Sequence, residues 1–222
     1  MVARVWLQAA KAKTPSRVIV ATDNERIAAA VRAVGGEAMM TSPDHPSGTD
    51  RIAEVARAVA GDIYLNVQGD LPFIAPEDLD ALAAPMINNE DIAMATLTTP
   101  ITNEAEWRNP NVVKVVLAAN GDALYFSRSP IPYPRDSAGP PPEALRHIGV
   151  YAYRRDFLLR FAALGQGTLE RIEKLEQLRA LERGFRIGAV ASAAPSMEID
   201  TAEDLARARA FAGREGLKRA EL

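Results

Sequence analysis

Apolar and polar positions alternate along the chain with two periods, one typical of strands and one typical of helices. Short runs rich in β-branched residues predict buried strands at 17–23, 37–41, 63–68 and 92–99. Amphipathic stretches around them predict helices at 1–13, 24–34, 50–60 and from Pro76 onward. This alternation predicts an α/β fold with a mostly parallel sheet that carries helices on both faces.

The pattern changes after Asn111. Two strand-like runs are joined by Asn120-Gly121, a dipeptide that favours a tight β-hairpin, and a proline-rich stretch follows. We expect a small antiparallel lobe at about 111–155, which either closes a cleft or forms a dimer interface. The remaining pattern predicts a strand at 147–154, a helix at 168–183, a strand at 185–190 and a helix from Thr201. Together these elements predict a single domain over residues 1–222.

Composition excludes several classes of protein. The formal net charge of −3 gives no reason to expect nucleic acid as a partner, although a locally basic cleft is compatible with an anionic small molecule. The absence of cysteine excludes disulfides and thiolate metal sites. No apolar run approaches the ~18 residues of a membrane span. The N-terminal residues do not form a signal peptide, because Arg4 and Gln8 interrupt their apolar run.

Asp70 is the first candidate for chemistry. It follows Gly69 directly after the predicted strand at 63–68, and ligands of open α/β sheets bind beyond the carboxyl ends of the strands. A carboxylate in that position suits Mg²⁺, which commonly takes one or two protein carboxylates beside substrate phosphates. An Asp that only caps the following turn is an equally good interpretation. Asp200 also precedes a predicted helix, so it is either an N-cap or a second carboxylate for the same metal.

The segment HPSGTDR, residues 45–51, is the second candidate. Ser47, Gly48 and Thr49 precede a predicted helix, and the exposed N–H groups of a helix start suit an anion or a base edge. The simpler interpretation is an N-cap formed by Thr49 or Asp50.

Several polar side chains downstream form the third group of candidates. Glu173 and Gln177 are four residues apart on the predicted helix at 168–183, so they share a face that is either solvated or contacts a polyhydroxylated ligand. His147 and Tyr151 share a face of their predicted strand, where His147 is either a structural residue or a donor that positions a ligand.

The charged residues near the hairpin have a simpler expected role. Lys114 and Arg128 flank the hairpin, and surface ion pairs are their expected role unless an anionic substrate lies nearby. A metal site with two histidines would need both His45 and His147, and we do not expect one.

These segments, in this order, resemble the family of 3-deoxy-manno-octulosonate (Kdo) cytidylyltransferases. The resemblance covers about residues 17–209 and is most specific where several motifs occur together. The matching stretches are VIVATDNERI, MTSPDHPSGTDRIAEV, NVQGDLPFI, NPNVVKVV, ALYFSRSPIPY, RHIGVYAYR, LERIEKLEQLRALE and EIDTAEDLARAR.

The resemblance implies a Rossmann-like nucleotide-diphospho-sugar transferase fold and the reaction of CTP with Kdo to give CMP-Kdo and pyrophosphate. It implies that Asp70 and Asp200 hold Mg²⁺, and that Ser47, Gly48 and Arg51 lie near the nucleotide. It further implies a cytoplasmic homodimer that serves lipopolysaccharide synthesis. The residues expected to face the sugar acid are Gln68, Arg128, His147, Tyr151, Glu173 and Gln177. A related enzyme for another sugar acid, and a non-catalytic sugar-binding protein, are the alternatives.

Two departures from the family pattern affect the expectation. Many relatives carry Glu where this chain has Leu71. The resemblance also implies a preceding segment of roughly 25 residues, with a first strand and a triphosphate-binding loop of the form RxxSxRLPxKPL, that this chain lacks. Either the natural protein is longer and active, or the chain is truncated, in which case unpaired sheet edges would cost about 1–3 kcal/mol per buried group.

Overall fold

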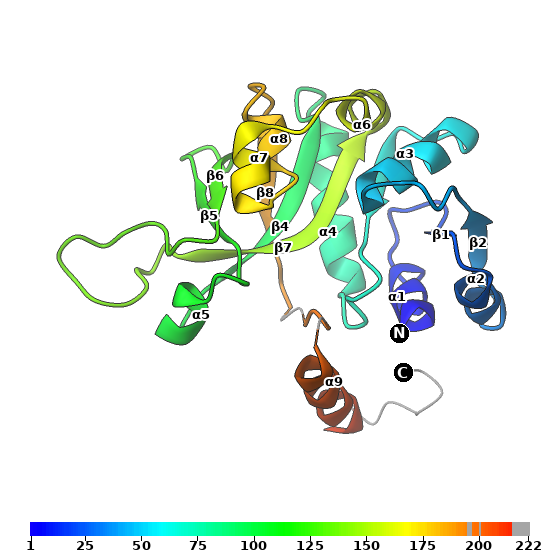
Figure 1. The fold of residues 1–222 in the computed structure, drawn as a ribbon, viewed down its shortest axis with the longest axis horizontal. Helices are drawn as coiled ribbons and strands as arrows, with labels where there is room; N and C mark the ends of the chain where they lie inside the picture. Colours follow the sequence, from blue (N-terminus) through cyan, green and yellow to red (C-terminus); the bar gives the residue numbers. More distant parts are fainter. Residues whose placement is uncertain (195–196, 200, 215–222) are drawn as a thin grey trace. The chain divides into compact units, whose positions relative to one another are not determined.

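The computed structural model describes residues 1–194, 197–199 and 201–214. Figure 1 shows the chain as a set of strands and helices that alternate along the sequence. The strands are β1 (Ile19–Thr22), β2 (Glu37–Met40), β3 (Ile63–Asn66), β4 (Met94–Pro100), β5 (Lys114–Leu117), β6 (Ala123–Ser127), β7 (Leu145–Arg154) and β8 (Ile187–Ala191). The helices are α1 (Val2–Ala9), α2 (Glu25–Arg32), α3 (Gly48–Ala58), α4 (Pro76–Asn88), α5 (Glu104–Arg108), α6 (Arg155–Ala162), α7 (Thr168–Glu173), α8 (Leu178–Leu181) and α9 (Ala202–Arg214).

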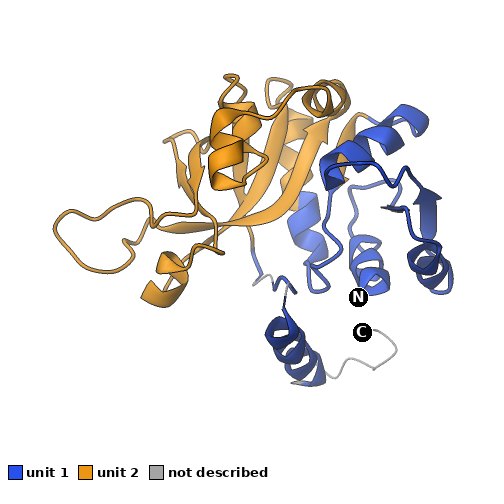
Figure 2. Ribbon diagram, viewed as in Figure 1, with its two compact units in different colours: residues 1–61, 66–80, 193–222 blue, residues 62–65, 81–192 orange. Residues whose placement is uncertain are grey.

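The chain divides into two compact units, coloured separately in Figure 2. Unit 1 comprises residues 1–61, 66–80 and 193–222, and unit 2 comprises residues 62–65 and 81–192. The prediction of a single domain over 1–222 stays a prediction.

Unit 1 contains the parallel pair β1 and β2 with helices packed against it. Helix α2 begins at Asn24, whose side chain accepts a hydrogen bond from the backbone N–H of Arg26, an N-cap interaction that satisfies a donor at the helix start. After α2 the chain turns at Gly36, where a Cβ atom would lie 2.6 Å from Val31 and 2.9 Å from Trp6. Only glycine therefore allows the indole of α1 to pack on the turn that leads into β2.

Unit 2 is built on a sheet with the strand order β6-β5-β7-β4-β8, in which β3 also pairs with β7. Strand β4 pairs in parallel with β8 and antiparallel with the long strand β7 (Figure 1). The hairpin β5–β6 turns at Gly121, which has a φ of +85°, as the Asn-Gly signal predicts. The antiparallel strands β5, β6 and β7 lie within residues 111–155, where the antiparallel lobe was expected.

The predicted helix at 168–183 is wrong in one respect. The chain forms α7, then leaves the helix at Lys174, and continues as the short helix α8. Lys174 has φ 55° and ψ 47°, a left-handed conformation that ends the run of helical hydrogen bonds. Glu173 and Gln177 therefore do not share the face of one continuous helix.

The sequence interpretation also missed α5 and α6. For α5 a signal was present, because Asn103 is followed three residues later by Glu106, and the Asn103 side chain accepts from the Glu106 N–H at 2.8 Å. For α6 the signal was the helical spacing of Phe157, Leu158 and Phe161, all of which are buried. Within the described residues, no helix is both long enough and apolar enough to cross a membrane.

Candidate functional site

The loop after β3 belongs to unit 1 and carries Gln68, Gly69 and Asp70. Asp70 is half-buried, and its backbone carbonyl accepts a hydrogen bond from the N–H of Ile199 at 3.0 Å. The structure therefore ties the strand-end loop to the segment that leads toward the last helix. Asp200, the expected second carboxylate, lies outside the described residues.

The start of helix α3 brings three predicted residues together. Ser47 is the N-cap, because its Oγ accepts from the Asp50 N–H at 3.2 Å, so the expectation that Thr49 or Asp50 caps the helix is wrong. Gly48 follows, and a Cβ added to it would lie 3.5 Å from the side-chain amide of Gln68. Gln68, expected on the sugar side, thus packs against the same helix start as the residues expected near the nucleotide.

Arg51 fastens this helix to the ends of the small parallel sheet. Its Nη1 donates to Thr41 Oγ1 at 2.6 Å and to the carbonyl of Ser42 at 3.3 Å, and its Nη2 lies 3.6 Å from Asp23 Oδ2. The guanidinium is mostly buried by these contacts, so Arg51 helps to place the strand ends as well as adding positive charge beside the helix N-terminus.

The loop before α3 is held by a histidine–carboxylate pair. His45 Nε2 contacts Glu54 Oε2, and Glu54 also accepts from the Ser42 N–H at 3.1 Å. The hydrogen bond from His45, followed by that from Ser42, lowers the pKa of Glu54 below its ordinary value. This pair holds the 42–47 loop against the helix.

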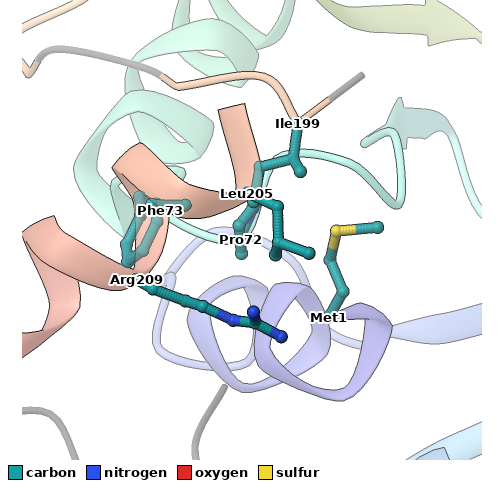
Figure 3. Close-up of a pocket in the computed structure, with 7 residues that line it drawn as sticks. Met1, Pro72, Phe73, Ile199, Leu205 and Arg209 are labelled. Atoms are coloured by element: carbon teal, nitrogen blue, oxygen red, sulfur yellow. The ribbon is translucent and has the colours of Figure 1, made fainter. Parts of the chain in front are cut away.

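A pocket in unit 1 lies next to the Asp70 loop (Figure 3). Pro72 and Phe73 line it, together with side chains from α9, among which Arg209 lies at the edge. Phe73 also packs edge-to-face on Phe211 at 5.0 Å between ring centroids. Apart from Arg209, the side chains that line it are apolar, so among them only the Arg209 guanidinium could contact a phosphate.

In unit 2, β7 carries the candidates expected to contact a sugar. The rings of His147 and Tyr151 lie 5.4 Å apart, so the prediction that they share a face is confirmed. The Tyr151 hydroxyl donates to Gln177 Oε1 at 3.1 Å. Gln177 is buried, and its Nε2 has no hydrogen-bond partner within the described part of the chain. A buried donor without a partner is costly, and it is a position where a bound ligand can supply the acceptor.

Burial controls the charge of His147. Desolvation, followed by repulsion from Arg146, lowers the pKa of His147 from 6.5 to about 3. The imidazole is therefore neutral at physiological pH.

Glu173 and Arg128 meet at the end of α7. The Glu173 carboxylate accepts from Ser127 Oγ at 2.7 Å and from the Arg128 N–H at 3.0 Å. In return, Arg128 Nε donates to the Glu173 carbonyl at 2.6 Å and Arg128 Nη2 donates to the Lys174 carbonyl at 3.4 Å. These contacts satisfy carbonyls left open where the helix ends. Arg128 Nη1 also donates to the carbonyl of Pro110 at 2.9 Å, so each guanidinium nitrogen has a backbone acceptor and one N–H on each Nη remains for a ligand.

Lys114 does not form the surface ion pair that was expected. Its side chain is fully buried, and Nζ donates to the carbonyls of Asn109 at 2.9 Å, Val112 at 2.6 Å and Arg128 at 2.6 Å. Desolvation by burial lowers its pKa. The three carbonyls satisfy all three ammonium donors, so Lys114 positions the Arg128 backbone rather than meeting solvent.

The residues available to bind a metal ion are few. Among residues 1–194, 197–199 and 201–214, no group of three or more His, Cys, Asp or Glu side chains is arranged to hold an ion. Asp70 offers a single half-buried carboxylate on a strand-end loop. That donor set suits Mg²⁺ shared with substrate phosphates better than a metal held wholly by protein.

The arrangement of these residues can be compared with known proteins. A model of the cytidylyltransferase family matches residues 1–187. The chain is 51% identical to the 3-deoxy-manno-octulosonate cytidylyltransferase of Syntrophotalea carbinolica, over 95% of this chain and 87% of that protein. This chain belongs to the 3-deoxy-manno-octulosonate cytidylyltransferase family.

Other members and solved structures agree with this family assignment. The enzyme of the same name from Geobacter metallireducens is 49% identical, over 92% of this chain and 84% of that protein. The structure of a CMP:2-keto-3-deoxy-manno-octonic acid synthetase complexed with CTP has a TM-score of 0.90 and 42% identity, and covers 96% of this chain and 88% of that one. A cytidylyltransferase structure from Leptospira borgpetersenii, with a TM-score of 0.60 at 14% identity over 100% of this chain and 78% of that one, shares the fold alone. The predicted α/β nucleotidyltransferase fold is therefore confirmed.

Proposed function

We propose that this protein transfers CMP from CTP to the anomeric hydroxyl of Kdo, giving CMP-Kdo and pyrophosphate. The observation that carries the proposal is the match, along nearly the whole chain, to a CMP-Kdo synthetase structure that holds CTP. Most of the residues expected on the sugar side lie in unit 2, on β7, just after β6 and around the α7–α8 junction, whereas Gln68 lies in unit 1. The residues expected on the nucleotide side lie at the start of α3 in unit 1.

In this reaction the anomeric oxygen forms a bond to the α-phosphorus of CTP while the bond from that phosphorus to pyrophosphate breaks. The hydroxyl proton leaves to solvent as the bond forms. The protein contributes positioning of the two substrates and neutralisation of charge that moves onto the leaving pyrophosphate.

The nucleotide side uses the start of α3. Ser47, Gly48 and Arg51 supply a capped helix N-terminus and a nearby guanidinium, which favour phosphate or a base edge. Asp70, with Asp200 as the second carboxylate, would hold Mg²⁺ beside the phosphates. When bound, Mg²⁺ would neutralise phosphate charge and lower the barrier to displacement.

The sugar side mainly uses polar groups of unit 2, with Gln68 of unit 1. Gln177 offers an Nε2 donor, and Tyr151 holds the amide in that orientation through its bond to Oε1. Arg128 retains donors for the sugar carboxylate, and Glu173 fixes Arg128 in place through its main chain. His147 and Gln68 complete the set of residues that we assign to the sugar acid.

We further propose that the protein works in the cytoplasm as a homodimer in lipopolysaccharide synthesis. The proline-rich excursion supports a dimer, since Tyr133 within it is 81% exposed, and a large exposed aromatic ring in such a segment suits an interface. Light scattering behind size exclusion, with Tyr133→Ser beside wild type, tests this. A monomeric wild-type protein at micromolar concentration would contradict it.

The activity is tested by measuring pyrophosphate release from CTP and Kdo with and without Mg²⁺. We expect release that needs all three, and that is far slower with N-acetylneuraminate in place of Kdo. Thermal stabilisation by Kdo without any release of pyrophosphate would contradict the enzyme activity and support a sugar-binding protein instead. Faster release of pyrophosphate with N-acetylneuraminate would contradict Kdo as the substrate and support a cytidylyltransferase for another sugar acid.

A further inference from the structure

Thr96, on β4, is a fully buried polar residue that none of the preceding assignments uses. It lies where the antiparallel register between β4 and β7 shifts. Thr96 is opposite Tyr151, whereas the next residue, Leu97, is opposite Ile148, so β7 bulges between these positions. The bulge frees backbone carbonyls inside the sheet, and buried carbonyls need a donor.

The Thr96 hydroxyl meets three polar atoms at this bulge. Its Oγ1 lies 2.8 Å from the carbonyl oxygen of Val150, 3.3 Å from that of Ile148, and 2.9 Å from Nε2 of His147. A carbonyl oxygen can only accept, and the hydroxyl has a single hydrogen to donate. That hydrogen goes to the carbonyls, with the shorter contact to Val150 as its main acceptor.

The direction of the remaining bond follows. If Nε2 of His147 carried no proton, the hydroxyl would have to donate to it, and its lone pairs would then face two carbonyl oxygens inside a dry sheet. With a proton on Nε2, the ring donates to Oγ1 and every contact becomes favourable. A neutral imidazole with its proton on Nε2 has a lone pair on Nδ1.

We infer that Thr96 is a positioning residue that holds His147 as the neutral Nε2–H tautomer, so that Nδ1 accepts a hydrogen bond from a hydroxyl of the sugar and does not bind the sugar carboxylate. The assignment of the ligand rests on the proposed function, but the tautomer does not. The lone pair on Nδ1 repels a carboxylate oxygen, whereas a sugar hydroxyl can donate a hydrogen bond to Nδ1.

The surroundings of the ring fit this assignment. Phe126 packs edge-on against His147 at 5.1 Å and Tyr151 lies on another side, so the neighbours on β6 and β7 are aromatic, and no hydrogen bond within the described residues involves Nδ1. The Tyr151 hydroxyl donates to Gln177, and Nε2 of Gln177 is a donor without an acceptor among the described residues. An acceptor on His147 and a donor on Gln177, linked through Tyr151, are the complement of sugar hydroxyls, which both donate and accept.

The tautomer is tested directly by nitrogen NMR of protein labelled in histidine. The chain has two histidines, so the variant His45→Gln leaves a single ring and assigns its signals without ambiguity. Long-range proton–nitrogen spectra at pH 7, without substrate, are expected to show protonated Nε2 and unprotonated Nδ1. A ring protonated on Nδ1, or on both nitrogens, overturns the inference without the need for any variant of Thr96.

Two substitutions separate positioning from mere stability. Thr96→Ser keeps the hydroxyl and should keep the tautomer, whereas Thr96→Val keeps the shape and should mix the two tautomers. We expect Thr96→Val to raise KM for Kdo about tenfold, the effect of one misdirected hydrogen bond, with KM for CTP changed less than about twofold. Equal behaviour of the Ser and Val variants in the NMR spectrum overturns the role of the hydroxyl.

Addition of Kdo separates this inference from the proposed function. On saturation with Kdo, the Nδ1 resonance should shift as it accepts a hydrogen bond, while Nε2 stays protonated. If calorimetry detects Kdo binding and Nδ1 does not shift, the acceptor role is wrong. If calorimetry detects no Kdo binding but the Nε2–H tautomer is present, the proposed function fails and the positioning role of Thr96 stands.

Discussion

The candidate site residues of unit 1 lie on the loop after β3 and at the start of α3, whereas those of unit 2 lie mainly on a long strand and around a helix break. In unit 1, Ser47 and Arg51 are committed to capping and to the ends of β1 and β2. In unit 2, Tyr151 and Gln177 form a buried chain with a donor left over. On the proposed assignment, the sugar side is preorganised by burial, whereas the nucleotide side relies on the start of a helix.

The largest expected effect is on stability in unit 2. Arg179 and Glu170 form a buried pair, with Arg179 Nη2 2.6 Å and Nε 2.8 Å from the two carboxylate oxygens, and this pair joins α7 to α8. Arg179→Met leaves the Glu170 charge buried alone, so we expect a loss of about 3–5 kcal/mol in the free energy of unfolding. Urea denaturation measures this.

Two further variants control the Arg179 experiment. The double variant Glu170→Leu with Arg179→Met removes both charges and should recover much of the loss. Arg183→Met, on the exposed side of the same turn, should cost less than about 1 kcal/mol. An Arg179→Met variant as stable as wild type would contradict the stabilising role of the buried pair.

The next effect is on turnover through unit 1. Asp70→Asn keeps the shape of the side chain and its backbone tie to Ile199 but removes the charge. We expect kcat to fall about a hundredfold or more, with unfolding free energy changed by less than about 1 kcal/mol. Asp44→Asn, an exposed carboxylate on a nearby loop, is the matched control and should retain full turnover. Normal turnover by Asp70→Asn would contradict the metal role.

The pH dependence of stability distinguishes the buried histidine of unit 2. The pKa of His147 is lowered to about 3 in the folded protein. Between about pH 6.5 and pH 3 the imidazole is therefore protonated in the unfolded chain but neutral in the folded protein. The contribution of the neutral His147 to the free energy of unfolding is therefore complete above pH 6.5 and declines as the pH falls, by at most about 1.4 kcal/mol per pH unit. Comparison with His147→Gln isolates it from the carboxylates, and parallel stability curves for the two proteins would contradict the burial of a neutral ring.

The smallest effect compares one helix cap in each unit. Ser47→Ala and Asn103→Ala each remove an N-cap oxygen, and each should cost about 1 kcal/mol in thermal or urea unfolding. Only Ser47→Ala should also raise KM for CTP, because only that helix start is assigned to the nucleotide. An equal rise in KM for both variants would remove the distinction between the units.

Local chemistry in the sequence was enough to locate much of the fold. The alternation of strands and helices predicts β1, α2, β4 and α4 to within a few residues, because hydrophobic period and helix caps are properties of neighbouring residues. The Asn120-Gly121 turn follows for the same reason, since it depends on backbone freedom at two positions. The motifs around Asp70, Ser47 and His147 also identified the family.

Tertiary contacts decided what the side chains do. Lys114 carries no sequence signal of burial, and only the three carbonyls that converge on Nζ allow an ammonium to leave water. Glu173 was expected to share a helix face with Gln177, but the bonds to Ser127 and Arg128 accompany a helix break at Lys174. The tautomer of His147 depends on a bulge that brings residues 96 and 150 together. Sequence patterns describe neighbours along the chain, whereas satisfying buried donors and charges depends on partners that only the folded chain supplies.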